Sequence, residues 1–212
     1  MMGPLPPHGR LGDFLPPEER DALLSWVLGQ EQHFTPAMVK PRGEDGAAKL
    51  DAVTRVALKL RAIGPLEQQL RTRLLAALPA AMHAAGSSGP EPRSLELELT
   101  AYGDGAFYAP HLDIPVGPDR RPLGNHPGED RMISAVYYFH REPKRFAGGA
   151  LRLFRFGVAD DSPGGFVDLP PEQNSLLLFP SWARHEVRPV ECPGGSFADY
   201  RFALNCWYCR AL

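Results

Sequence analysis

Two histidines and one aspartate stand out in this sequence because their side chains can bind a metal. His111 and Asp113 are separated by one residue in the tripeptide His111-Leu112-Asp113. On a strand, residues two apart project from the same face, so these two side chains can reach one point. His185 lies much farther along the chain, at the start of a strand-like run. If the fold brings His185 to the same point, the three side chains form a metal site.

Two histidines and one carboxylate on one face of a metal leave three positions open. This facial arrangement is typical of non-haem iron(II) sites, where the open positions can take a bidentate oxo acid and dioxygen. The HxD tripeptide alone is weak evidence, because the chain has seven histidines and most histidines are surface or core residues. A structural metal and a hydrolytic metal site on the same ligands are the alternatives.

An arginine and a tyrosine are the next candidates. Alternation puts four residues of the last predicted strand on one face: Arg201, Ala203, Asn205 and Trp207. Tyr102, nine residues before His111, shares its strand face with polar residues and lies opposite three leucines. A buried arginine is costly unless it is paired, and a dicarboxylate is a natural bidentate partner. The alternatives are an arginine at the barrel rim paired with a glutamate, and a tyrosine that caps the core.

The period of the hydrophobic residues predicts the elements that position these side chains. After the break at 86–90, apolar and polar residues alternate in 95–100, which is typical of a strand. Further strands are expected at 132–139, 150–155, 174–179, 185–190 and 200–209. We therefore expect a mainly β fold with flanking α, a double-stranded β-helix (jelly roll), with N-terminal helices packed on the outside.

The first part of the chain has a helical pattern. Residues 1–17 are rich in Pro and Gly and are expected to be loosely held, whereas helices are predicted from Glu18 and from about Leu66 to Leu78. Leu70, Leu74 and Leu75 are expected on one helix face. This predicts a helical region over 1–90 that packs on a jelly-roll core over 91–212, as one structural unit.

Composition excludes several classes of protein. The net charge of −2 and the lack of a basic stripe argue against a nucleic-acid partner. No apolar run is long enough to span a membrane, and the N-terminus does not resemble a signal peptide, so a cytoplasmic location is expected. An odd number of cysteines argues against a disulfide framework; Cys206 and Cys209 are expected to be buried structural thiols.

Six motifs occur in a fixed order along residues 95–209. They are Tyr102-Gly103-Asp104-Gly105-Ala106-Phe107-Tyr108-Ala109-Pro110-His111-Leu112-Asp113, Ser134-Ala135-Val136-Tyr137-Tyr138-Phe139, Gly148-Gly149-Ala150-Leu151, Leu178-Phe179-Pro180-Ser181, His185-Glu186-Val187, and Arg201-Phe202-Ala203-Leu204 with Trp207-Tyr208. In this order they resemble the segments of prolyl 4-hydroxylase-like 2-oxoglutarate- and Fe(II)-dependent oxygenases. Six ordered motifs are far more specific than any one of them.

The resemblance implies a role for each matching residue. His111, Asp113 and His185 would be the catalytic iron ligands. Arg201 would hold the distal carboxylate of 2-oxoglutarate, with the other cosubstrate contacts at Tyr102, Tyr138, Asn205 and Trp207. A register slip of one residue would exchange Tyr138 for Tyr137. Arg201 lies 16 residues after His185, farther than is usual in the family, and Arg188 is the substitute if the intervening loop does not absorb the difference.

The expected function is that of a dioxygenase that hydroxylates a C–H bond, with a prolyl residue as one candidate substrate and a free amino acid or other metabolite as another. Its cofactors would be Fe(II), 2-oxoglutarate as cosubstrate and ascorbate as a candidate reductant, with dioxygen as the second cosubstrate. The insertion at 114–130 is either a functional lid or a disordered segment. His126 and the Arg120-Arg121 pair within it are expected to be solvated, with a contact to the substrate as the alternative if the insertion closes as a lid. The alternative from another class is a non-catalytic jelly-roll module that binds a metal or a peptide.

Overall fold

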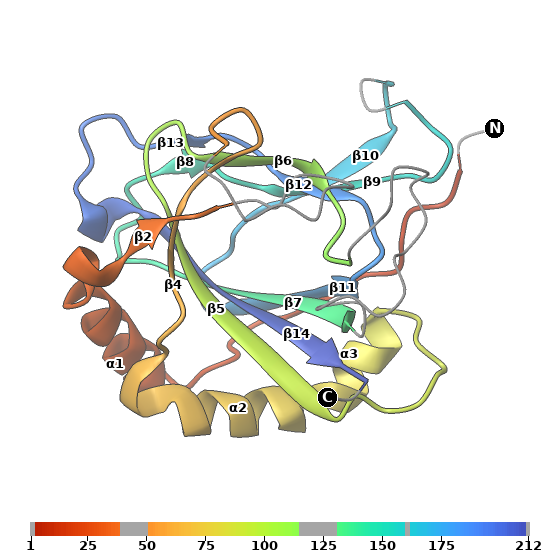
Figure 1. Ribbon diagram of the computed structural model, residues 1–212, viewed down its shortest axis with the longest axis horizontal. Coiled ribbons are helices and arrows are strands. Elements are labelled where there is room, and N and C mark those ends of the chain that lie inside the picture. Colours follow the sequence, from red (N-terminus) through yellow and green to blue (C-terminus); the bar gives the residue numbers. More distant parts are fainter. Residues whose placement is uncertain (1–2, 39–50, 115–130, 160–161, 211–212) are drawn as a thin grey trace.

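The computed structural model describes residues 3–38, 51–114, 131–159 and 162–210. These residues form two antiparallel sheets that face each other, and helices cover the outer face of the larger sheet (Figure 1). This is the mainly β jelly roll with outer helices that the alternating pattern predicts. The candidate lid residues His126, Arg120 and Arg121 lie outside the described residues.

The larger sheet has seven strands within the described residues. Their order across the sheet is β1 (Gly9–Leu11), β11 (Ser175–Pro180), β7 (Arg131–Phe139), β14 (Arg201–Cys209), β5 (Ser94–Tyr102), β4 (Leu58–Leu60) and β2 (Thr35–Pro36). The two long central strands, β5 and β14, pair along their whole length, with Arg201 opposite Tyr102. Their register therefore places two of the candidate site residues side by side at one end of the sheet.

The smaller sheet has five strands within the described residues and carries the histidines. Its order is β10 (Phe166–Leu169), β9 (Leu151–Phe154), β12 (His185–Val187), β6 (Phe107–His111) and β3 (Arg55–Val56). Beside it, β8 (Ala147–Gly148) pairs with β13 (Val190–Glu191). Because β12 pairs with β6 at His185 and His111, residues far apart in sequence become neighbours.

The helices are α1 (Pro17–Leu28), α2 (Glu67–Ala76) and α3 (Leu78–Ala84), with short 3-10 turns at Glu31–His33, Gly64–Leu66 and Phe197–Asp199. Helices α1 and α3 carry a proline in the first turn, where no backbone N–H is needed. Leu70 and Leu74 of α2 are buried, as expected for residues four apart. The expectation for Leu75 is wrong: it is 49% exposed, because one further residue turns about 100° around the helix.

Two layers of apolar side chains result. One lies between the helices and the larger sheet and takes the inner residues of β14: Phe202, Leu204, Cys206 and Tyr208. The other lies between the two sheets and includes Tyr138, Leu153, Phe179 and Ala203. Cys206 and Cys209 are both buried and neither forms a disulfide, as expected. The alternate residues of β14, among them Arg201, Asn205 and Trp207, therefore face the interior of the barrel, where the candidate site lies.

The segment before residue 91 contributes more than helices. Residues 9–11, expected to be loosely held, form β1 and pair with β11, so that expectation is wrong. Strands β2, β3 and β4 are also drawn from this segment and extend the edges of both sheets. The boundary near residue 90 therefore separates stretches of sequence and does not separate sheets. None of the helices in the described ranges has the length and apolarity of a membrane span.

Candidate metal centre

The two histidines and the aspartate converge at the mouth of the barrel. Nε2 of His111 lies 3.6 Å from Asp113 Oδ1, and Nε2 of His185 lies 3.7 Å from Asp113 Oδ2. One ligand atom from each residue lies within 4.8 Å of the others, so a single ion can contact all three. Strand β6 ends at His111, so the spacing argument was incomplete: Asp113 lies just past the strand, in a bend.

Backbone carbonyls orient both imidazoles. Nδ1 of His111 lies 2.9 Å from the carbonyl oxygen of Ala109, and Nδ1 of His185 lies 2.8 Å from that of Ala183. An imidazole whose Nδ1–H donates to a carbonyl keeps Nε2 unprotonated and free to bind a metal. The ring of Tyr108 stacks on that of His111, with 3.5 Å between the centroids. Both rings are therefore held with Nε2 toward Asp113.

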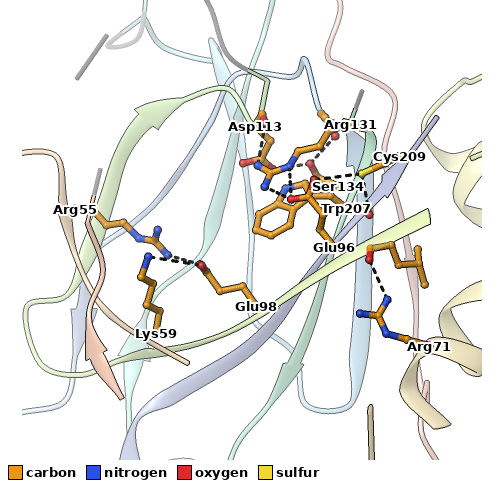
Figure 2. A network of polar contacts seen from close by, with 12 residues as sticks. Arg55, Lys59, Arg71, Glu96, Glu98, Asp113, Arg131, Ser134, Trp207 and Cys209 are labelled. Atoms are coloured by element: carbon orange, nitrogen blue, oxygen red, sulfur yellow. Dashed lines mark hydrogen bonds and ion pairs between the residues drawn. The ribbon is translucent and has the colours of Figure 1, made fainter. Parts of the chain in front are cut away.

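Side chains from the larger sheet hold Asp113 (Figure 2). The hydroxyl of Ser134 donates to Asp113 Oδ2 at 2.5 Å and lies 3.0 Å from that of Ser181. The backbone N–H of Asp113 donates to the carbonyl of Ser181 at 3.1 Å, and Arg131 donates to the carbonyl of Asp113 at 3.2 Å. These bonds fix the carboxylate although it lies outside regular secondary structure.

The environment holds His111 and Asp113 in the protonation states that a metal needs. Burial, followed by the nearby His185, lowers the pKa of His111 to about 3. Burial alone would raise the pKa of Asp113, but His185, His111 and the hydrogen bond from Ser134 lower it to about 2. A neutral imidazole and an ionised carboxylate are the forms that coordinate a metal ion. The donor set therefore fits a divalent ion such as iron(II).

A cavity of about 330 Å³ extends from these ligands into the barrel. It is lined by Met38, Arg55, Lys59, Arg61, Glu98, Tyr102, Tyr108, His111, Leu112, Asp113, Arg131, Val136, Leu151, His185, Val187, Arg201, Asn205 and Trp207. The predicted faces of β5 and β14 are confirmed, since Glu98 and Tyr102 line the cavity, as do Arg201, Asn205 and Trp207. Trp207 forms a wall on which the guanidinium of Arg131 stacks, 3.9 Å from the ring.

Arg201 lies in this cavity without a carboxylate partner. Its residue is 2% exposed, and its Nε donates to the carbonyl of Gly149 at 2.8 Å. A Cβ on Gly149 would lie 2.7 Å from Cδ of Arg201, so this close approach needs a glycine. The guanidinium lies 4.8 Å from the rings of both Tyr102 and Tyr138. Among the described residues, Arg201 forms no ion pair, which is the arrangement expected of a site for an anion.

Tyr138 rather than Tyr137 lies beside Arg201. The hydroxyl of Tyr137 points to the helix layer and donates to Asn174 at 2.8 Å. The buried hydroxyl of Tyr138 has no hydrogen-bond partner in the described structure, and burial raises its pKa. Tyr138 does not itself line the cavity. Arg188, the substitute for Arg201, has a side chain that is 43% exposed and pairs with Glu186 outside the cavity.

Several residues of the site were missed from the sequence. Ser134 and Ser181 lie within two of the six motifs, but nothing in their spacing indicates that they meet at Asp113. Arg55 and Lys59 come from β3 and β4, which are too short to show a period. They enter the cavity because these strands pair with β6 and β5, and such pairing cannot be read from a single sequence.

Known proteins resemble this chain over the same residues. The family model described as the 2OG-Fe(II) oxygenase superfamily matches residues 97–209. An uncharacterized PKHD-type hydroxylase from Synechocystis sp., sll0191, is 30% identical over 203 residues, which cover 94% of this chain and 62% of the relative. A PKHD-type hydroxylase from Synechococcus elongatus is 32% identical over 52% of this chain and 41% of its own length. The chain thus spans less than two thirds of these relatives.

Two solved structures share the fold. A prolyl-4-hydroxylase from Pseudomonas putida is similar with a TM-score of 0.66 and 22% identity, over 96% of this chain and 92% of its own. A prolyl hydroxylase from Trichoplax adhaerens, in complex with a peptide fragment of the hypoxia inducible factor oxygen degradation domain, has a TM-score of 0.65 and 18% identity, over 97% and 84%. The family model covers more than half of the chain, and its match includes His111, Asp113, His185 and Arg201. The chain belongs to the 2OG-Fe(II) oxygenase superfamily.

Proposed function

We propose that this chain is an Fe(II)- and 2-oxoglutarate-dependent dioxygenase that hydroxylates a C–H bond. The observation that carries the proposal is a buried, unpaired arginine in the same cavity as a two-histidine, one-carboxylate cluster. The first feature fits the distal carboxylate of a dicarboxylate, and the second fits iron(II) with open positions. A cavity that only packed side chains together would have no reason to leave Arg201 without an acidic partner.

His111, Asp113 and His185 would hold the metal. When bound, iron(II) would supply the activation of dioxygen, coupled to oxidative decarboxylation of 2-oxoglutarate. The chain itself keeps Nε2 of each histidine free through bonds to Ala109 and Ala183. Ser134 holds one oxygen of Asp113, which keeps the carboxylate from rotating. These contacts fix the geometry at which the remaining positions face the cavity.

Arg201 would bind the distal carboxylate of 2-oxoglutarate, with Tyr138 as a further donor. The Tyr138 hydroxyl is buried without a partner, so an anionic oxygen beside Arg201 would satisfy it. Tyr102 also packs against the guanidinium. Tyr102, Asn205 and Trp207 all line the cavity. Charge-assisted bonds in so buried a place are strong because water does not screen them.

A prolyl residue is the first substrate to test. The two fold neighbours described above are prolyl hydroxylases, and one was solved with a peptide. Likeness of fold does not fix a substrate, so a free amino acid stays in the assay as well. Ascorbate belongs in the assay as an accessory reductant. A cytoplasmic location is part of the proposal and fits the three buried cysteines, none of which forms a disulfide.

The rival is a module that binds a metal or a peptide without catalysis. Binding of 2-oxoglutarate separates the two, because such a module has no need to recognise this dicarboxylate. A hydrolytic centre on the same three ligands would likewise leave Arg201 and Tyr138 without a shared purpose.

The test measures succinate formation with iron(II), ascorbate, 2-oxoglutarate and dioxygen, with and without proline peptides and L-proline. The His185→Ala variant serves as the blank, and calorimetric titration of 2-oxoglutarate runs in parallel. We expect succinate above the blank and binding of 2-oxoglutarate that requires the metal. Absence of both from a folded protein would refute the oxygenase and favour the binding module.

A further inference from the structure

More basic side chains line the cavity than the binding of 2-oxoglutarate requires. Five basic side chains and two carboxylates line it. Arg131 is neutralised by an ion pair with Glu96, and Arg201 is assigned to the cosubstrate by the proposed function. Of the two lining carboxylates, Asp113 belongs to the metal centre. Three cations thus remain, Arg55, Lys59 and Arg61, with Glu98 as the acid among them.

Glu98 is not enough to neutralise this group. Arg55 lies 3.4 Å from one of its oxygens and Lys59 4.0 Å from the other, so one carboxylate is shared by two cations at long distances (Figure 2). The Arg55 side chain is only 10% exposed, and its buried Nε has no hydrogen-bond partner in the described structure. A buried guanidinium that is incompletely paired is unfavourable, and an additional anion would relieve it.

The three cations, hereafter the basic rim, are placed along the cavity by β3, by β4 and by the residue that follows β4. Lys59 of β4 pairs opposite Thr100 of β5, which puts it on the cavity face, while Leu58 and Leu60 point to the helix layer. Arg61 follows two residues later and is exposed. Arg55 lies 4.7 Å from the ring of Tyr108, which in turn stacks on His111. The basic rim is therefore one aromatic ring away from a metal ligand.

We propose that the substrate carries a carboxylate close to the C–H bond that reacts, and that the basic rim binds this carboxylate. Arg55 and Lys59 bind it directly, and Arg61 at the exposed edge attracts it. The inference rests on the proposed function and adds a substrate class to it. The carboxylate can belong to an acidic residue beside the target in a peptide, or to the α-carboxylate of a free amino acid.

The experiment measures binding by calorimetry to the protein loaded with Mn(II), with and without 2-oxoglutarate. The probes are blocked peptides with a central proline flanked by glutamates, by glutamines or by lysines, together with L-proline and L-prolinamide. The variants are Lys59→Gln and Arg61→Gln, which change partly exposed side chains, and Arg55→Gln if it folds. Arg141→Gln is the matched control, since Arg141 is an exposed, ion-paired arginine outside the cavity.

We expect the glutamate peptide to bind about tenfold more tightly than the glutamine peptide, with the lysine peptide weakest. Lys59→Gln and Arg61→Gln should each reduce the ratio of the affinities for the glutamate and glutamine peptides by roughly two- to fivefold. Arg141→Gln should leave this ratio unchanged. Added salt should weaken the effect of Arg61→Gln on this ratio more than that of Lys59→Gln, because exposed charges are screened. If the carboxylate is that of an amino acid, L-proline binds, L-prolinamide does not, and the variants weaken L-proline.

Equal affinity for the glutamate and glutamine peptides, and for L-proline and L-prolinamide, would overturn the inference. So would a loss of 2-oxoglutarate affinity in Lys59→Gln, because the basic rim would then serve the cosubstrate. The proposed function fails separately, if 2-oxoglutarate does not bind to the wild type. The charge preference measured without 2-oxoglutarate still decides the inference in that case.

Discussion

Arg201 is the buried charge on which the proposed cosubstrate site depends. It is almost inaccessible to water, yet it has a carbonyl and two aromatic rings as neighbours where an acid would be expected. Such a group is tolerated in a folded protein when its partner arrives from outside. Asp113, in contrast, has its hydrogen bonds in place before any ligand binds. Under the proposed function, the first residue would bind the cosubstrate and the second the metal.

Replacement of Arg201 by alanine should weaken 2-oxoglutarate binding by about 2–5 kcal/mol, because a desolvated charge pair loses one partner. Calorimetric titration of 2-oxoglutarate into the Mn(II)-loaded protein measures this, and metal affinity should change little. Arg188→Ala is the control, since its exposed side chain lies outside the cavity. A large effect in Arg188→Ala with none in Arg201→Ala would show that the cosubstrate assignment is wrong.

Ser134→Ala should lower the affinity for the metal by about 10- to 100-fold, because Asp113 loses the hydroxyl that orients it. Titration with Mn(II) gives the affinity, and His185→Ala gives the level expected when a ligand is missing. Ser175→Ala is the matched control, since this buried serine bonds to the carbonyl of Glu172, away from the triad. An unchanged Mn(II) affinity in Ser134→Ala would mean that Asp113 needs no such support.

At the scale of elements, the sequence predicts the long strands, in which apolar and polar residues alternate, and misses the short strands, which have no such pattern. The long strands β5, β7 and β14 were predicted within two residues, because one face of each packs on apolar side chains and the other lines the barrel. The same parity placed Arg201 and Trp207 in the cavity. The two- and three-residue strands β2, β3 and β4 show no period, so the basic rim was not anticipated.

The last strand is also tied to the helices by a buried hydrogen bond. The buried hydroxyl of Tyr208 in β14 donates to the carbonyl of Leu74 in α2 at 2.7 Å. Tyr208→Phe should lower the free energy of unfolding by about 1 kcal/mol, because a buried hydrogen bond is lost with little change in packing. Urea unfolding followed by circular dichroism measures it. Tyr200→Phe, which changes a tyrosine without such a bond among the described residues, should cost less; the reverse order would contradict the assignment.

For the molecule as a whole, the helices cover one face of the larger sheet (Figure 1). The cavity lies on the other face of that sheet. The helix layer, hereafter the backing, consists of α1, α2 and α3. It buries Phe202, Leu204 and Tyr208 of β14, whose neighbours in sequence line the cavity. The helices of this backing all lie before residue 91, and the same part of the chain also supplies the edges of both sheets and, through β3 and β4, the basic rim of the cavity. Stability of the backing and function of the cavity should therefore be separable by substitution.

The ion pair between Glu19 of α1 and Arg73 of α2 is the place to test this separation. The hydrogen bond from Arg73 lowers the pKa of Glu19, whose side chain is 13% exposed. A carboxyl with a lowered folded pKa stabilises the protein above its unfolded pKa, and this contribution is lost as pH falls through the folded value. Glu19→Gln should therefore lower Tm at pH 7, and its difference from wild type should shrink below about pH 4.

Glu18→Gln, an exposed neighbour, is the control. The affinity for 2-oxoglutarate at pH 7 should be the same in all three proteins. A Tm difference that stays constant from pH 7 to pH 3, or a change in that affinity, would argue against an independent backing.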